Sequence, residues 1–295
     1  DLDGKLSSSM SNAGNVIIAS HFDLGEQVGR QDKELPPFII KSALEEHDGF
    51  SESAIGVRSP VDILGNAAAG VGHLNMIADA DGVVRTEALL VNYYGKAIPS
   101  LALMAVLKGL NLTLADVTLH GRDPEKFIRI GKPRISTNSN AAMRPQFYPA
   151  SNNKPAFATD SFYDVISGKI PAAKYTGKIV VIGSTAAGVG VQFATPAFPA
   201  SSPAELAATV ISSILNEHFI VSPDWSVVLL LLLVLLIPAY LIFGLPRLGA
   251  GAAAILSGAL LFVLLGTEFF LLAKQSVWLQ LVFPSALLII GHVLI

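Results

Sequence analysis

Residues 72–85 read GHLNMIADADGVVR. The pair Asp81-Gly82 within this stretch is typical of a tight turn, because aspartate accepts hydrogen bonds from nearby backbone and glycine tolerates a positive φ. Apolar and polar residues alternate before and after the pair, which is the pattern of half-buried strands. The stretch therefore predicts a β-hairpin, in which Arg85 reaches back across the turn to Asp79 or Asp81.

The same turn has some features of a calcium-binding loop. An EF-hand loop has oxygen ligands at its first, third and fifth positions, glycine at the sixth and glutamate at the twelfth. With Gly82 at the sixth position, Asp79 and Asp81 fall on the third and fifth. The first position is then Ile77 and the twelfth is Ala88, and neither side chain carries an oxygen. We therefore expect a structural turn and no metal site.

A glycine-rich stretch, VVIGSTAAGVG, occupies residues 180–190. A turn of this kind can bind phosphate. A Walker A loop, however, needs Lys and Ser or Thr after its last glycine, and here Gly188 is followed by Val189. The dinucleotide pattern Gly-x-Gly-x-x-Gly is also missing. We expect Gly183 and Gly188 to serve a closely packed turn after a buried strand at residues 177–184, without a nucleotide cofactor.

The apolar residues concentrate at one end of the chain. The 295 residues are 52% hydrophobic and only 15% charged, yet residues 1–222 have the composition of a globular domain. The segment 223–295 contains apolar runs at about 227–245, 248–273 and 276–295, each long enough to cross roughly 30 Å of hydrocarbon as a helix. We expect a C-terminal bundle of three transmembrane helices, preceded by an α/β domain with a mixed sheet covered by helices.

The sequence offers no catalytic constellation. The six histidines are dispersed, without zincin spacing or a neighbouring nucleophile. Cysteine is absent, which excludes disulfides and thiolate metal sites. The net charge is −3 and no basic stripe is visible, so nucleic acid is not an expected partner. We expect no catalytic residue, metal or cofactor in this chain, and we expect the lipid bilayer as a partner.

Four motifs follow one another along the globular part: GHLNMIADADGVVR, PSLALMAV, DSFYDVISGKI and GKIVVIGSTAAGVGVQFATP. In this order, followed by a helix and apolar spans, they resemble the CHASE2 family, the extracytoplasmic sensor domains of bacterial transmembrane receptors. The residues that these motifs single out are His73, Asp79, Asp81, Gly82, Arg85, Gly183 and Gly188.

The resemblance implies a location at the bacterial inner (cytoplasmic) membrane, with the soluble domain in the periplasm. It implies a further N-terminal part of the domain and a cytoplasmic output module beyond residue 295, for which an adenylate or guanylate cyclase is our first expectation. The sequence departs from the family pattern at Val191-Gln192, where an acidic residue is usual, and at residues 203–208, where only the glutamate and one alanine are kept. These departures alter any ligand site formed there.

Two functions remain open from the sequence. The first is the sensor and membrane portion of a signalling receptor that works as a homo-oligomer, expected to be a dimer, or with a membrane partner. The alternative is a non-enzymatic, membrane-anchored accessory or structural subunit that uses the domain for protein contacts.

Overall fold

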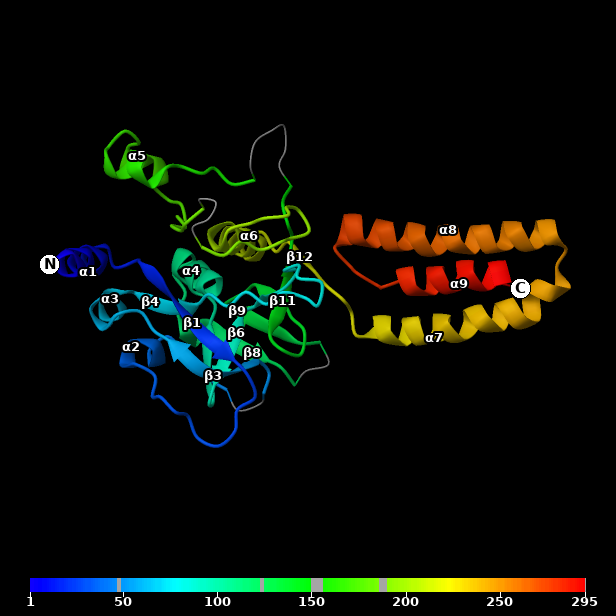
Figure 1. Cartoon of the computed structure of the whole chain (residues 1–295), viewed down its shortest axis with the longest axis horizontal. Helices are drawn as coiled ribbons and strands as arrows, with labels where there is room; N and C mark the ends of the chain where they lie inside the picture. Colours follow the sequence, from blue (N-terminus) through cyan, green and yellow to red (C-terminus); the bar gives the residue numbers. More distant parts are fainter. Residues whose placement is uncertain (47–48, 123–124, 150–155, 186–189, 295) are drawn as a thin grey trace. The chain divides into compact units, whose positions relative to one another are not determined.

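The computed structural model describes residues 1–46, 49–122, 125–149, 156–185 and 190–294 (Figure 1). The chain divides into two units, Asp1–Phe219 and Ile220–Ile295, and each is described by itself. The first unit is a mixed α/β domain, as the sequence predicts, and the second consists mainly of apolar helices.

A six-stranded sheet organises the first unit, with the order β2-β7-β6-β3-β1-β4. β1 pairs in parallel with β4 and antiparallel with β3, and β3 pairs in parallel with β6, so the sheet is mixed. The strands are β1 (Ile17–Leu24), β2 (Leu44–Glu45), β3 (Glu52–Arg58), β4 (Gly70–His73), β6 (Leu90–Tyr93) and β7 (Lys96–Pro99).

Two three-stranded sheets and six α-helices complete the described part of this unit, and the last strand, β12, lies at its C-terminal boundary. One sheet has the order β10-β9-β8 and the other β12-β11-β5. Their strands are β5 (Glu87–Ala88), β8 (Val117–His120), β9 (Phe127–Ile130), β10 (Arg134–Ser136), β11 (Ala142–Pro145) and β12 (Phe219–Ile220). The helices are α1 (Leu2–Ala13), α2 (Pro37–Ile40), α3 (Asp62–Ala67), α4 (Leu101–Gly109), α5 (Phe162–Ile166) and α6 (Pro203–Leu215).

The two helices that line the core, α4 and α6, begin at side-chain caps. Ser100 Oγ accepts a hydrogen bond from the Leu103 N–H (3.1 Å) at the start of α4, and serine is a preferred residue at this capping position. Ser202 and Glu205 form a capping box at the start of α6, and Pro203 occupies the first turn. These caps fix where each helix begins.

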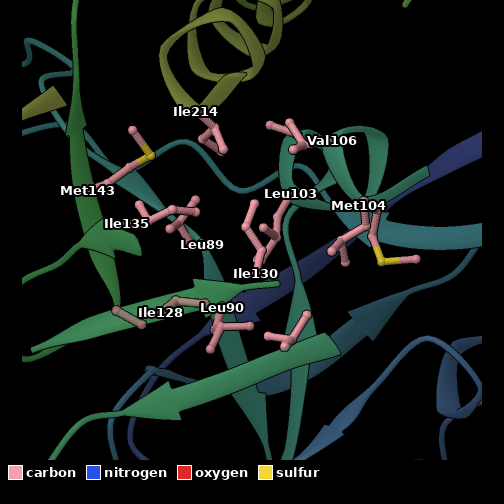
Figure 2. Close-up of a cluster of buried hydrophobic side chains, with 14 of the residues drawn as sticks. Leu89, Leu90, Leu103, Met104, Val106, Ile128, Ile130, Ile135, Met143 and Ile214 are labelled. Carbon is pink, nitrogen blue, oxygen red and sulfur yellow. The ribbon is translucent and has the colours of Figure 1, made fainter. Parts of the chain in front are cut away.

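α4 and α6 lie side by side over one cluster of buried side chains. In Figure 2, Leu103 and Val106 of α4 and Ile214 of α6 point toward side chains from the strands below them. Each such burial contributes about 1.5–3 kcal/mol of hydrophobic stabilisation. Fully buried members of this core are Leu89, Leu90, Leu103, Ile128, Ile130, Ile135, Met143 and Ile214.

The hairpin predicted across Asp81-Gly82 is wrong. The strand before the turn, β4, pairs with β1, whereas the strand after it, β6, pairs with β3 and β7. The hairpin of this region is β6–β7, closed by Tyr94 and Gly95 with φ values of 51° and 89°. Two consecutive positive φ angles suit the twist of a two-residue hairpin turn. Alternation indicated that strands lie on both sides of the turn, but it overstated their lengths and carried no information about their partners.

The strand predicted at residues 177–184 is also wrong. Residues 178–185 have no regular secondary structure, and the Val180 and Ile182 side chains are 50% and 75% exposed. Val181, between them, is partly buried against the core. A continuous apolar run is typical of a strand covered on both faces, but among the described residues no strand pairs with this segment.

The second unit contains α7 (Trp225–Ala239), α8 (Ala250–Gln275) and α9 (Val282–Leu294). A π-helical turn (Tyr240–Gly244) and a 3₁₀ turn (Leu245–Arg247) extend α7. By length and composition, the two continuous helical segments Trp225–Arg247 and Ala250–Gln275 can each cross a membrane, with mean hydropathies of 3.0 and 2.2.

The third predicted span is shorter than the sequence indicates. Its helix is α9, which has 13 residues. Ser276 takes a left-handed conformation (φ 53°) that ends α8, and Gln280 also has a positive φ, so residues 276–281 are not helical. Hydropathy counts apolar residues without regard to backbone conformation, which is why it overstated this span.

Gly72 and Gly70 on β4 provide a matched test of the α4–β4 packing. A Cβ at Gly72 would lie 2.6 Å from the backbone of Leu101, which cannot move alone, whereas at Gly70 it would meet the flexible end of Met104. We predict that Gly72→Ala lowers the free energy of unfolding by about 1–3 kcal/mol and that Gly70→Ala lowers it less. Urea denaturation of both variants checks this, and equal losses would contradict the proposed close approach.

Candidate functional site

The turn at residues 79–85 is closed by its own backbone. The Gly82 N–H donates to the Asp79 carbonyl (2.8 Å), and the Asp79 N–H donates to the Val83 carbonyl (2.9 Å). Asp81 Oδ1 accepts from the Val83 N–H (3.1 Å), and Gly82 has a φ of 79°. The Asp-Gly sequence therefore produces a compact loop, although the loop does not join two paired strands.

Arg85 bridges the two aspartates of this turn. One guanidinium nitrogen donates to Asp79 Oδ2 (2.6 Å) and Asp81 Oδ1 (2.9 Å), and the other donates to Asp81 Oδ2 (2.7 Å). The hydrogen bonds from Arg85 lower the pKa of Asp81 to about 2. Both carboxylates are therefore paired with the guanidinium group of Arg85. In the described part of the chain, no three acidic or histidine side chains are close enough together to hold a metal ion.

The turn is joined to the last of the four sequence motifs. Val83 forms a parallel bridge with Ala194, and the Val84 N–H donates to the Ala194 carbonyl (2.8 Å). Phe193 and Ser201 then exchange two backbone hydrogen bonds (2.9 and 2.8 Å), which return the chain to the start of α6. The first and last motifs, far apart in the sequence, therefore meet beside the α6 N-terminus.

A buried carboxyl group lies next to this turn in the sequence. Glu87 of β5 pairs with Met143 of β11. Glu87 is buried, with only 4% of its surface exposed. Burial raises the pKa of Glu87 to about 8, so the group is protonated at neutral pH. The neighbouring Arg144 is half-buried, which lowers its pKa, while the charge of Asp79 acts in the opposite direction. Sequence reasoning did not identify Glu87, because nothing local marks its burial.

His73 is a core residue in this structure. Its Nδ1 accepts from the Asn75 N–H (3.3 Å), and the Asn75 amide in turn bonds both backbone groups of Phe22 (3.0 and 2.6 Å). His73 Nε2 is buried without a partner among the described residues. Burial lowers the pKa of His73 to about 3, so the imidazole is neutral at physiological pH. Its position in β4 makes it a structural rather than a titrating group.

The structure describes one of the two glycines that were singled out in the fourth motif, Gly183 and Gly188. A Cβ at Gly183 would lie 2.7 Å from the Ala204 Cβ, so Gly183 permits a close approach to the first turn of α6. The approach borders a cavity of about 200 Å³ that Leu74 and Leu101 also line. Gly188 lies outside the described residues.

A larger cavity, of about 360 Å³, lies beside the N-terminal half of α6. Its described lining comes from residues 147–148, 156–159 and 195–201 and from residues 205–209 of α6. Four aromatic side chains and one carboxylate line it, namely Phe147, Tyr148, Phe157, Phe198 and Glu205. The sequence contains no compact motif for this cavity, because its described lining comes from four separate stretches of the chain.

The comparisons with known proteins identify the family. The model of the CHASE2 domain matches residues 1–241, which is more than half of the chain. The chain therefore belongs to the CHASE2 domain family, the extracytoplasmic sensor domains inferred from the sequence motifs. No curated protein and no solved structure matches the chain.

The raised pKa of Glu87 predicts a pH dependence of stability. Because the folded-state value of about 8 lies above the ordinary value of 4.5, unfolding releases a proton between these pH values. The contribution of Glu87 to the free energy of unfolding therefore falls as the pH rises from 4.5 to 8, by on the order of a few kcal/mol. The isosteric variant Glu87→Gln should remove this fall.

The measurement is urea denaturation of the wild-type chain and the variant in detergent across this pH range. His73 acts in the opposite sense, because its lowered pKa makes stability rise with pH up to its ordinary value of 6.5. Because His73 is present in both proteins, its contribution cancels when the free energy of unfolding of Glu87→Gln is subtracted from that of the wild type at each pH. Two parallel pH profiles would contradict the assignment of a buried, protonated Glu87.

Proposed function

We propose that this chain is the sensor and membrane portion of a bacterial signalling receptor. In this proposal the domain Asp1–Phe219 lies in the periplasm, the apolar helices lie in the inner membrane, and the output is a cytoplasmic adenylate or guanylate cyclase. Membership of the CHASE2 family supports the sensor role, and two helices of membrane-spanning length support the anchoring. The observation that carries the proposal is the direct path of the chain from α6 to α7.

The first part of this path is fixed by the domain core. Val210 and Ile214 of α6 are buried in it, and Phe219 packs against the same cluster after the helix has ended. The Gln146 N–H also donates to the His218 carbonyl (3.1 Å), which ties this segment to the chain after β11. α6 itself ends at Leu215, so only residues 216–218 lie between the helix and Phe219.

The second part of the path lies within the helical unit. The Val221 N–H donates to the Ser276 carbonyl (2.8 Å), and the Trp278 N–H donates to the Val221 carbonyl (2.9 Å). Val221 thereby forms a parallel bridge with Val277 in the link between α8 and α9. Only residues 222–224 separate it from α7. A displacement at Val221 is therefore expected to act on α7 and on the α8–α9 link together.

Polar contacts join the three helices of this unit. The Tyr240 hydroxyl lies 2.8 Å from Ser257 Oγ, which lies 3.0 Å from His292 Nδ1. Tyr240 opens the π-helical turn that follows Pro238 in α7. Glu268 Oε2 accepts from the Leu281 N–H (3.3 Å) just before α9. In apolar surroundings, breaking such a hydrogen bond costs more free energy than it does in water. We therefore expect a movement of α7 to displace α9 as well.

One observation favours the alternative of a non-enzymatic accessory subunit. The described part of the domain exposes several large apolar side chains on α5 and the segment that follows, which fits a surface for protein contacts or for a homodimer. These side chains are Phe162, Tyr163, Ile166, Val180 and Ile182. Formation of cyclic nucleotide by the full-length gene product would support the receptor, and a gene that encodes no output domain after residue 295 would support the subunit.

The first test of the proposal concerns membrane topology. Because the chain has no cysteine, single-cysteine variants can be labelled without background. We predict that a membrane-impermeant maleimide labels Ser167→Cys and Lys274→Cys in cells with a permeabilised outer membrane, whereas Arg247→Cys is labelled only after lysis. All three positions are exposed. Labelling of Arg247→Cys in intact cells would refute this orientation.

The second test concerns the short joint before α7. We predict that about ten flexible residues inserted after Ser222 uncouple the output of the full-length receptor while the protein remains folded in the membrane, because a flexible linker absorbs displacement. Cyclic nucleotide is measured under growth conditions that change the wild-type output. The matched control is the same insertion after Gly29, an exposed loop residue with no close neighbour. A normal response with the Ser222 insertion would exclude rigid coupling through this joint.

A further inference from the structure

We propose that the cavity beside the N-terminal half of α6 binds a small organic ammonium ion that carries an apolar body. This inference deepens the proposed sensor function, on which it rests, by assigning a class of ligand to the domain. The cavity measures about 360 Å³, which is near the lower end of the range for small-molecule sites in proteins. A ligand with one ring and a short chain fits this volume.

The aromatic wall is held in a defined arrangement. The rings of Tyr148 and Phe157 are nearly perpendicular (89°), with their centroids 6.0 Å apart. The Tyr148 hydroxyl lies 3.2 Å from His218 Nδ1, and this hydrogen bond fixes the ring. Phe147 and Phe198 also line the cavity. Aromatic ring faces attract cations, and several rings around one space are the usual means of recognising an ammonium group.

The charge of the lining has the sign that an ammonium ion requires. Glu205 provides the one carboxylate of the described lining, and neither lysine nor arginine accompanies it there. Its Oε2 accepts from the N–H and the hydroxyl of Ser202 (2.8 and 3.0 Å), which holds the carboxylate in place. Because Glu205 already occupies the positive end of the α6 dipole, an anionic ligand would meet a like charge.

The hydroxyl groups of the lining are already used within the protein. Thr195 Oγ1 donates to the Phe198 carbonyl and accepts from the Phe198 N–H (both 3.0 Å). Thr209 Oγ1 donates to the Glu205 carbonyl (2.9 Å), and Ser201 Oγ lies 3.4 Å from Thr195 Oγ1. A ligand rich in hydroxyl groups would find few free partners. The cavity therefore favours an apolar body with a single positive group.

Three probes of similar size and different charge test this inference: 2-phenylethylammonium, 2-phenylethanol and 3-phenylpropanoate. Binding to the whole chain in detergent is measured by calorimetry, which needs no signalling output. We expect saturable one-to-one binding of the ammonium probe, at least about tenfold tighter than binding of the alcohol, and no binding of the carboxylate. Absence of saturable ammonium binding, or equal affinity for all three probes, would overturn the proposal.

Variants locate the site. Glu205→Gln keeps an oxygen that can cap α6 but removes the charge, so it should weaken ammonium binding about tenfold or more and leave alcohol binding unchanged. Glu217→Gln, at an exposed position beyond the C-terminal end of α6, removes the same charge and should have no effect. Phe157→Leu should weaken the ammonium probe more than the alcohol. Equal ammonium affinities of Glu205→Gln and Glu217→Gln would contradict the site. A receptor that binds the probe but drives no output would instead contradict the proposed function alone.

Discussion

The burial of one face of α6 in the domain core is the contact on which the rest of the structure depends. Val210 and Ile214 place the helix against the same cluster that holds Leu89 and Met143. A helix of 13 residues is about 20 Å long and behaves as a rod over that length. The cavity lies beside the N-terminal half of α6, and the chain leaves toward α7 from the C-terminal end of the helix. A displacement of α6 would therefore move both the wall of the cavity and the start of the segment that leads to α7.

The turn at residues 79–85 and its partners fix the chain that leads into α6. Ion pairs between exposed groups contribute little to the free energy of unfolding. The ion pairs of Arg85 with Asp79 and Asp81 therefore act mainly by fixing the conformation of the loop. The shaped loop presents Val84 to Ala194, and that contact positions the residues that border the cavity. The charged motif therefore supports the local fold, whereas the proposed ligand site is the aromatic cavity.

Local signals in the sequence predicted local structure. A serine before an apolar run with helical spacing and a glycine after such a run are local helix signals, and Ser100 caps α4 while Gly168, with a φ of 77°, follows α5. Order and content of the motifs indicated the CHASE2 family, and the family match confirms this. Long-range features were not predictable in the same way. The partners of β4 and β6, the absence of a strand at residues 178–185 and the burial of Glu87 depend on residues that are distant in sequence.

Amide hydrogen exchange at Val221 and Trp278 tests most directly whether the packing of α6 controls the segment of the chain that leads into α7. Ile214→Ala and Ile39→Ala each remove a fully buried side chain, from the α6 core and from the second core cluster respectively, at a cost of about 2–5 kcal/mol. The account predicts faster exchange at Val221 and Trp278 in Ile214→Ala than in Ile39→Ala when both variants remain folded. Equal exchange at these two amides in the two variants would contradict it.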